Sequence, residues 1–252
     1  MKYVRFLDSK NEIRYGIVEG EKVRLLDGPF LDSKSNPTDA VLSSHEITLL
    51  APVEPSKVIC VGLNYALHAE ELDHALPEDP VIFMKPQTSV IGPDAQIICP
   101  KVSQRVDYEA ELAVVIGKTI KDVPENEAAA AIFGYTCAND VTARDLQKKD
   151  GQWTRGKSFD TFCPIGPWVV TDIDPSHLDI QLLLNGEIKQ SSNTRYFINS
   201  VPKLVSFMSQ VMTLNPGDVV LTGTPEGVGP MQPGDEVIVR LQSIGELRNT
   251  VE

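Results

Sequence analysis

Acidic side chains interrupt an apolar segment near the middle of the chain. Residues 106–115 read VDYEAELAVV, which places Glu109 and Glu111 two positions apart. In a β-strand, residues two apart share a face, so both carboxylates should point the same way. Adjacent carboxylates repel and are costly to bury without a cation, whereas Mg²⁺ and Mn²⁺ favour oxygen ligands. The segment therefore indicates a metal site, with a solvated acidic strand face as the alternative.

A third carboxylate, Asp140, follows the apolar run FGYTCAN at 133–139, where a strand is expected to give way to a helix. Arg144 lies four residues further on and Gln147 seven, so all three should share one helix face. An acid, a cation and an amide on one face suit an anionic ligand beside a metal. An N-capping aspartate with an i,i+4 ion pair explains the same spacing.

His68 and Glu71 are three residues apart in the segment NYALHAEE, which is typical of a short helix. A carboxylate beside an imidazole orients the ring and raises its basicity, so the pair could act as a general base on water. An exposed His–Glu pair on a surface helix is the alternative.

Two lysines and a glycine-rich loop could bind the rest of an anionic substrate. Lys85 in FMKP and Lys157 in WTRGKSF have apolar or aromatic neighbours and could pair with a carboxylate; the alternative is a surface lysine with a buried stem. The loop LTGTPEGVG at 221–229 contains Thr224 and could present hydroxyls and backbone N–H groups to an anion. It lacks the Gly-Lys-Ser/Thr of a nucleotide-binding loop.

Two structural units are expected to position these residues. Residues 1–52 contain three short strand-like runs, at 3–7, 14–18 and 22–26, and the sequence APVEP at 51–55 predicts a boundary. Residues 53–252 are expected to form a β-rich catalytic domain with a few helices, at 64–72, 125–133 and 200–214. Strands and helices do not alternate regularly, so the predicted class is α+β and not a parallel βαβ fold.

The composition indicates which binding partners and which cellular compartment to expect. The 252 residues carry 23 Lys and Arg against 35 Asp and Glu, a net charge of −12, which disfavours nucleic-acid and anionic-membrane binding. No targeting segment or membrane-spanning apolar run is recognisable. The four cysteines are widely spaced, and we expect free thiols in a reducing, cytoplasmic setting.

Six motifs together resemble the fumarylacetoacetate hydrolase family, from about Val58 to the C-terminus and in family order. They are VGLNYALHAEE, FMKPQTSVIGP, VDYEAELAVVIGK, GYTCANDVTARDLQ, WTRGKSFDTFCPIGPW and LTGTPEGVG. The resemblance implies a mixed β-sandwich roll, here with a small N-terminal strand-rich subdomain. It also implies a Mg²⁺ or Mn²⁺ cofactor and a homodimer.

The resemblance also implies roles for individual residues. The metal ligands would be Glu109, Glu111 and Asp140, and the catalytic residues His68 and Glu71 on a lid, with Lys157 positioning or protonating the substrate. The substrate-binding residues would be Arg144, Gln147, Thr224, Lys85 and Tyr65; Ser89 also falls in a family motif. Leu67 departs from the family pattern, because many relatives carry Asp beside the histidine.

Members of this family act on small 2-oxo acids. The implied function is C–C bond hydrolysis or decarboxylation of acylpyruvates or oxaloacetate through a metal-stabilised enolate. The pair His68 and Glu71 favours bond cleavage, but an isomerase of 2-hydroxy-diene-dioates or an oxaloacetate tautomerase would use the same metal platform. A catalytically silent metal-dependent binding protein is the second alternative, and the charge of −12 disfavours a magnesium nuclease.

Overall fold

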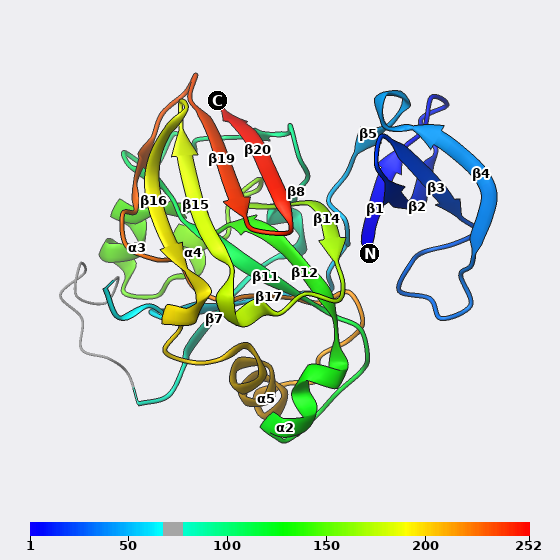
Figure 1. Ribbon diagram of the computed structural model, residues 1–252. Helices are drawn as coiled ribbons and strands as arrows, with labels where there is room; N and C mark the ends of the chain where they lie inside the picture. Colours follow the sequence, from blue (N-terminus) through cyan, green and yellow to red (C-terminus); the bar gives the residue numbers. More distant parts are fainter. Residues whose placement is uncertain (68–77) are drawn as a thin grey trace.

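Strands dominate the computed structural model, which describes residues 1–67 and 78–252 (Figure 1). The largest sheet has a main path that includes strands from both predicted units. Its order is β4 (Pro37–Ser43), β3 (Lys22–Leu26), β2 (Ile13–Glu19), β1 (Lys2–Leu7), β14 (Cys163–Val170), β12 (Ile132–Asn139), β11 (Ala110–Ile116), β17 (Val219–Leu221), β6 (Val58–Gly62) and β7 (Val81–Lys85). Two short strands lie beside this path, β5 (Thr48–Leu49) on β1 and β8 (Val90–Ile91) on β14. The predicted α+β, β-rich class is confirmed.

Two smaller sheets complete the main body. The five-stranded sheet has the order β16 (Glu187–Asn193), β15 (Asp179–Leu184), β19 (Glu236–Leu241), β20 (Gly245–Val251) and β9 (Gln96–Ile97). It packs against β11 and β12, and apolar side chains such as Leu112, Val114 and Leu182 fill the main core between the two layers. The three-stranded sheet is β13 (Thr142–Ala143), β10 (Val106–Tyr108) and β18 (Gly229–Met231).

The chain changes sheets at Glu109, between β10 and β11. At this break two side-chain amides replace the missing strand partners: Asn139 Oδ1 accepts from Glu109 N at 2.9 Å, and Gln190 Oε1 accepts from Ala110 N at 2.9 Å. The buried N–H groups are thereby satisfied, which a buried chain requires. Glu109 consequently lies where two sheets meet.

Helices are short and lie mainly around the sheets. Those that lie wholly within the described residues are α2 (Glu125–Ala128), α3 (Arg144–Asp150), α4 (Thr154–Lys157) and α5 (Val201–Val211), with 3₁₀ turns η1 (Ser44–Glu46), η2 (Gln87–Ser89), η3 (Ala129–Ala131), η4 (Pro175–His177) and η5 (Thr194–Tyr196). The Ser200 hydroxyl accepts from Lys203 N and caps α5, the helix predicted at 200–214. No helix in the described ranges is long and apolar enough to cross a membrane.

The helix predicted over 125–133 is wrong in its second half. The α-helix ends at Ala128, a 3₁₀ turn follows, and β12 begins at Ile132. Ile132 pairs with Ile116 of the neighbouring strand, so sheet pairing overrides the helix propensity of the alanines. The helix predicted at 64–72 extends into residues 68–77, outside the described residues.

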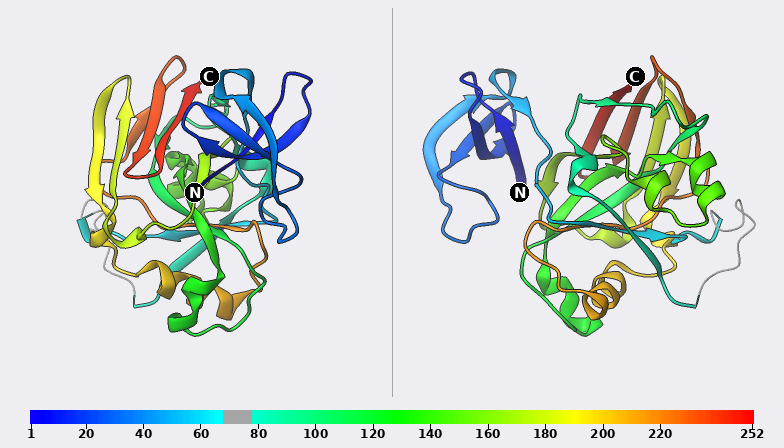
Figure 2. Two further views of the ribbon diagram at one scale, coloured as in Figure 1. Left: turned by 45° about the vertical axis from the view of Figure 1, so that its right-hand side comes forward. Right: turned by 180° about the vertical axis from the view of Figure 1, so that it is seen from behind.

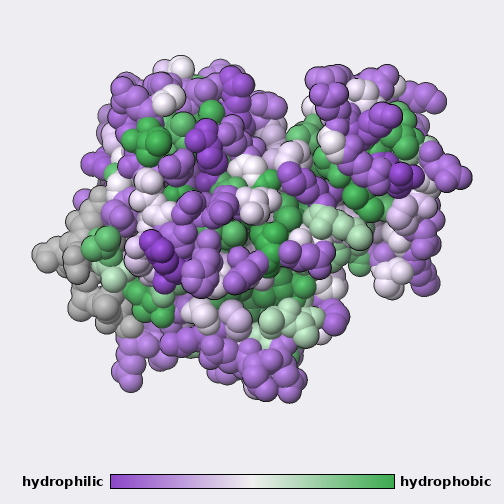
Figure 3. Space-filling model, viewed as in Figure 1, coloured by the Kyte–Doolittle hydropathy of each residue, from purple (hydrophilic) through white to green (hydrophobic). Residues whose placement is uncertain are grey.

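The first 52 residues form a lobe beside the main body (Figures 1 and 2). Strand β1 connects the two by pairing with β14, with Tyr3 opposite Val169. The rings of Tyr3, Phe30 and Phe133 pack together near this junction with centroids 5.2–5.4 Å apart. Figure 3 shows hydrophobic residues gathered where the lobe meets the body. The lobe therefore shares both a sheet and an apolar cluster with the rest of the chain.

Candidate active site

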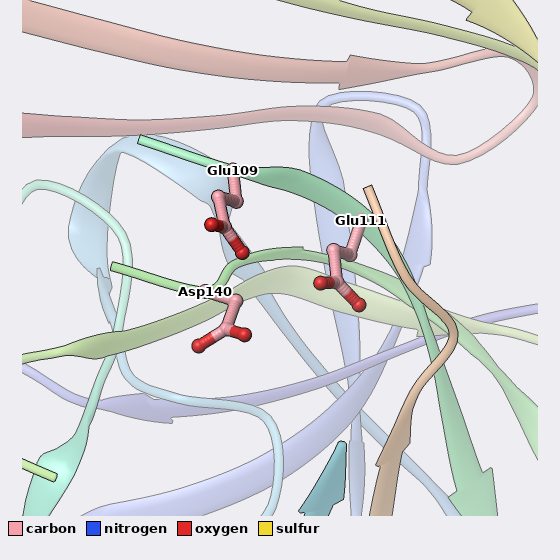
Figure 4. Close-up of side chains that lie close together, drawn as sticks. All are labelled: Glu109, Glu111 and Asp140. Atoms are coloured by element: carbon pink, nitrogen blue, oxygen red, sulfur yellow. The ribbon is translucent and has the colours of Figure 1, made fainter. Parts of the chain in front are cut away.

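Three carboxylates from adjacent strands converge in the main body (Figure 4). Glu109 lies at the break between β10 and β11, Glu111 lies on β11, and Asp140 directly follows β12. Ala110 pairs with Asn139 across the sheet, and this register brings Asp140 beside the two glutamates. One oxygen of each carboxylate lies within 4.8 Å of those of the others, and the three residues are 4%, 1% and 1% exposed.

Two buried lysines close around this carboxylate cluster. Lys157 Nζ donates to Glu109 Oε2 and Asp140 Oδ2, both at 2.7 Å. Lys85 Nζ donates to Asp140 Oδ1 at 2.6 Å and to the Val141 carbonyl at 3.1 Å. Burial lowers the pKa of Lys157, but Asp140 and Glu109 outweigh it and the net direction is upward. Lys157 is therefore expected to be a protonated ammonium.

Arg144 forms hydrogen bonds with Glu109 and with two further side chains. Its Nη2 donates to Glu109 Oε1, its Nη1 to Gln147 Oε1 at 2.7 Å, and its Nε to Asp107 Oδ2 at 2.9 Å. Asp107 is fully buried and also accepts from Arg105 Nε at 2.8 Å. Sequence reasoning missed Asp107, although it precedes Glu109 and Glu111 at the same two-residue spacing.

Glu111 is the carboxylate of the cluster that makes no ion pair with any described residue. It accepts from Gly223 N at 2.6 Å. Burial, then the charges of Asp140 and Glu109, raises the pKa of Glu111 well above its ordinary value. In the described part of the chain, Asp107, Glu109 and Asp140 pair with the buried cations Lys85, Lys157 and Arg144, and the half-exposed Arg105 also pairs with Asp107, so Glu111 is the carboxylate left without a counter-charge. The uncompensated carboxylate of Glu111 and the all-oxygen donor set fit a hard divalent cation such as Mg²⁺ or Mn²⁺.

Three further predicted residues, Thr224, Tyr65 and Ser89, are also buried. The Thr224 hydroxyl accepts from Gln190 Nε2 at 2.9 Å, in the loop that also carries Gly223. Tyr65 is buried, and its hydroxyl has no hydrogen-bond partner among the described residues. Burial, and then the charges of Glu111 and Glu226, raise the pKa of Tyr65. Ser89 donates to the Pro86 carbonyl within its own turn.

The structure does not test the predicted catalytic pair. His68 and Glu71 lie outside the described residues, and the preceding Leu67 is exposed.

Gln190 lies next to the site but was not predicted, because the polar segment KQSSN around it carries no motif. Its hydrogen-bond partners Thr224 and Ala110 are 34 and 80 residues away in the sequence, so no local pattern indicates them.

Comparison with known proteins places the chain in a family. Residues 57–252 match the model described as fumarylacetoacetate (FAA) hydrolase C-terminal, and residues 1–52 match the one described as Rv2993c-like, N-terminal. The structure is similar to that of 5-carboxymethyl-2-hydroxymuconate delta-isomerase from Mycobacterium smegmatis (45% identity, TM-score 0.93, covering 100% of this chain and 99% of that one). It is also similar to 2-hydroxyhepta-2,4-diene-1,7-dioate isomerase from Mycobacterium marinum (43% identity, TM-score 0.92, 100% and 98%).

A curated relative provides a third comparison. The mitochondrial oxaloacetate tautomerase Fahd2a of Rattus norvegicus is 47% identical over 218 residues, which cover 82% of this chain and 70% of the rat protein. The chain belongs to the fumarylacetoacetate hydrolase family. It is an enzyme of that family, in which the isomerase structures and the tautomerase are its relatives.

Proposed function

We propose that this protein is a Mg²⁺- or Mn²⁺-dependent enzyme that interconverts the keto and enol forms of a small 2-oxo acid, with oxaloacetate as the first candidate substrate. The observation that carries the proposal is the buried cluster of Glu109, Glu111 and Asp140, in which Glu111 pairs with no described cation. The name of the rat relative supports oxaloacetate, and the names of the mycobacterial structures support related dioates.

The chain's own residues have distinct tasks in this proposal. Glu109, Glu111 and Asp140 would hold the ion, which would act as a Lewis acid toward the oxygens of a 2-oxo acid and stabilise the developing enolate charge. Lys157, kept protonated by two carboxylates, can hold a proton beside the substrate. Thr224 would bind the anionic end of the substrate, and Arg144 keeps Glu109 in position.

The test is the conversion of enol-oxaloacetate to the ketone, followed by ultraviolet absorbance. We expect a rate well above the uncatalysed one with Mg²⁺ or Mn²⁺, loss of the excess rate with chelator, and its return when metal is added back. The Glu111→Gln variant is expected to stay at the uncatalysed rate. An enzyme that accelerates the reaction equally with and without chelator would contradict the proposal.

A second candidate function is C–C bond cleavage, namely hydrolysis of acylpyruvates or decarboxylation of oxaloacetate. The sequence observation that favours it is the pair His68 and Glu71, spaced as an imidazole and its orienting carboxylate would be on a helix. Hydrolysis needs an activated water, whereas enolisation and decarboxylation do not, so His68 separates the reactions.

His68→Ala is predicted to lower acylpyruvate hydrolysis roughly 100-fold or more, the usual scale for a removed general base. Oxaloacetate tautomerisation and decarboxylation should fall less, and Mn²⁺ affinity should be nearly unchanged because His68 is not a proposed ligand. All the reactions and Mn²⁺ binding are measured on one preparation. Unchanged hydrolysis would show that His68 has no catalytic role. Equal losses in every reaction would indicate that His68 orders the site and does not activate water.

A further inference from the structure

Gln190 connects the metal-binding strand to the loop that carries Thr224. It lies on β16 and is 1% exposed. Its Oε1 accepts from Ala110 N at 2.9 Å, and Ala110 is the residue between the two clustered glutamates. Its Nε2 donates to Thr224 Oγ1 and to the Pro225 carbonyl, both at 2.9 Å.

These three contacts fix the orientation of the Gln190 amide. A backbone N–H can only donate and a carbonyl can only accept, so Oε1 must face Ala110 and Nε2 must face Pro225. The second Nε2 hydrogen then points at Thr224, whose oxygen acts as the acceptor. The opposite amide orientation would place Nε2 against the Ala110 N–H, donor against donor, and Oε1 against the Pro225 carbonyl, acceptor against acceptor.

This orientation determines what the Thr224 hydroxyl can do. Its oxygen accepts from Gln190, so its own hydrogen must point elsewhere, and no described group accepts it. Thr224 is 3% exposed, and the two residues before it are anchored on β11: Thr222 Oγ1 donates to the Leu112 carbonyl at 2.9 Å, and Gly223 N donates to Glu111 at 2.6 Å. The hydroxyl is thus a rigid hydrogen-bond donor beside the carboxylate cluster.

We propose that Gln190 is a positioning residue that fixes the polarity of Thr224, so that the hydroxyl donates to the anionic end of the oxo-acid substrate. The proposal rests on the proposed function, because the acceptor of this hydrogen bond is the substrate carboxylate. A hydrogen bond to a charged group is strong and depends on donor direction, so the polarity of one hydroxyl has a measurable effect on affinity.

Gln190→Glu tests the polarity with almost no change in shape. A glutamate oxygen can still accept from Ala110 N, but the ionised carboxylate cannot donate, so the Thr224 hydrogen turns toward it and away from the ligand. The probe is oxalate, whose paired carboxylate oxygens resemble the chelating end of an enolised oxo acid, titrated by calorimetry into the Mg²⁺-loaded protein. We expect roughly tenfold or more weaker oxalate binding, as for a lost hydrogen bond to a charged group, with Mn²⁺ affinity nearly unchanged.

Three further variants distinguish an effect of the Thr224 hydroxyl direction from an effect of altered packing around residue 190. Thr224→Val removes the hydroxyl and should weaken oxalate binding to a similar degree, and adding Gln190→Glu to it should cause little further loss. Gln181→Glu, on the neighbouring β15 of the same hairpin and half-buried, should bind oxalate like the unmutated protein. In Gln190→Glu the loss should also grow with pH, because burial raises the pKa of the new carboxyl and its protonated form can still donate.

The outcomes are distinguishable. Additive, pH-independent losses in the double variant, or unchanged oxalate affinity in Gln190→Glu, would overturn the proposal. Even if Gln190→Glu fails to fold, unchanged oxalate affinity in Thr224→Val would overturn the proposal. An unmutated protein that binds Mg²⁺ but neither binds oxalate nor converts any oxo acid would refute the proposed function itself.

Discussion

Single residues at the site differ mainly in how their charges are compensated. Glu109 and Asp140 each meet ammonium or guanidinium groups within hydrogen-bond distance, whereas Glu111 meets a backbone N–H. The spacing of Glu109 and Glu111 in an apolar strand predicted that they share a face, and the family resemblance added Asp140 to them. Asp107 was not predicted, since nothing in the sequence indicates that Arg144 would reach it from 37 residues away.

The raised pKa of Glu111 makes the metal-free protein sensitive to pH. Because the folded state holds this proton more tightly than the unfolded state, stability falls as pH rises from the ordinary glutamate pKa toward the raised one. Without metal, Glu111→Gln is therefore predicted to melt at an equal or higher temperature near neutral pH, with a flatter pH dependence. It should also lose the Mn²⁺-induced rise in melting temperature. A full Mn²⁺-induced rise would remove Glu111 from the set of ligands.

Asp107 provides a second residue-level test. Asp107→Asn removes a fully buried charge and takes away one of the two carboxylates that pair with Arg144, so the free energy of unfolding should fall by about 3–5 kcal/mol. Arg105 also pairs with Asp107, and its side chain is 49% exposed. Arg105→Gln should therefore lower the free energy of unfolding by less than about 1 kcal/mol. Urea unfolding of the two variants compares them directly; equal costs would show that Asp107 is not held mainly by Arg144.

At the scale of elements, local patterns were predictable and cross-chain contacts were not. The apolar runs of β11 and β12 and the spacing of α5 indicated their structures directly. The short helix α2 stops because Ile132 pairs with β11, a contact invisible to local propensity. The break at Glu109 likewise depends on Asn139 and Gln190, which approach from other strands.

The loop after β17 gives a prediction at this scale. Gly223 has φ +95°, and a Cβ there would lie 2.7 Å from the Asn64 Cβ; Gly234 has φ +96° with nothing within 4 Å. Alanine at either position strains the backbone, but only Gly223→Ala should also displace the N–H that binds Glu111. We expect Mn²⁺ affinity to fall about tenfold or more in Gly223→Ala and to be unchanged in Gly234→Ala. Equal Mn²⁺ affinities would show that this hydrogen bond does not orient Glu111.

At the scale of the molecule, the N-terminal lobe is joined to the main body by a continuous sheet and by the rings of Tyr3, Phe30 and Phe133. The boundary near residue 52 stays a prediction, as do the homodimer and the cytoplasmic location. Because apolar contacts cross the boundary, we predict a single cooperative unfolding transition. Calorimetry that resolves two transitions would instead indicate two independently folding domains.

The central claim is that the cluster of Glu109, Glu111 and Asp140 supports metal-dependent enolisation of a 2-oxo acid. Exchange of the C3 hydrogens of pyruvate with D₂O, followed by NMR, measures enolisation through cleavage of the C3–H bond alone and requires no C–C bond cleavage. The account predicts exchange well above the uncatalysed rate with Mg²⁺ or Mn²⁺, none above it with chelator, and none in metal-loaded Glu111→Gln. Exchange that persists with chelator, or that proceeds at the full rate in Glu111→Gln, would contradict it.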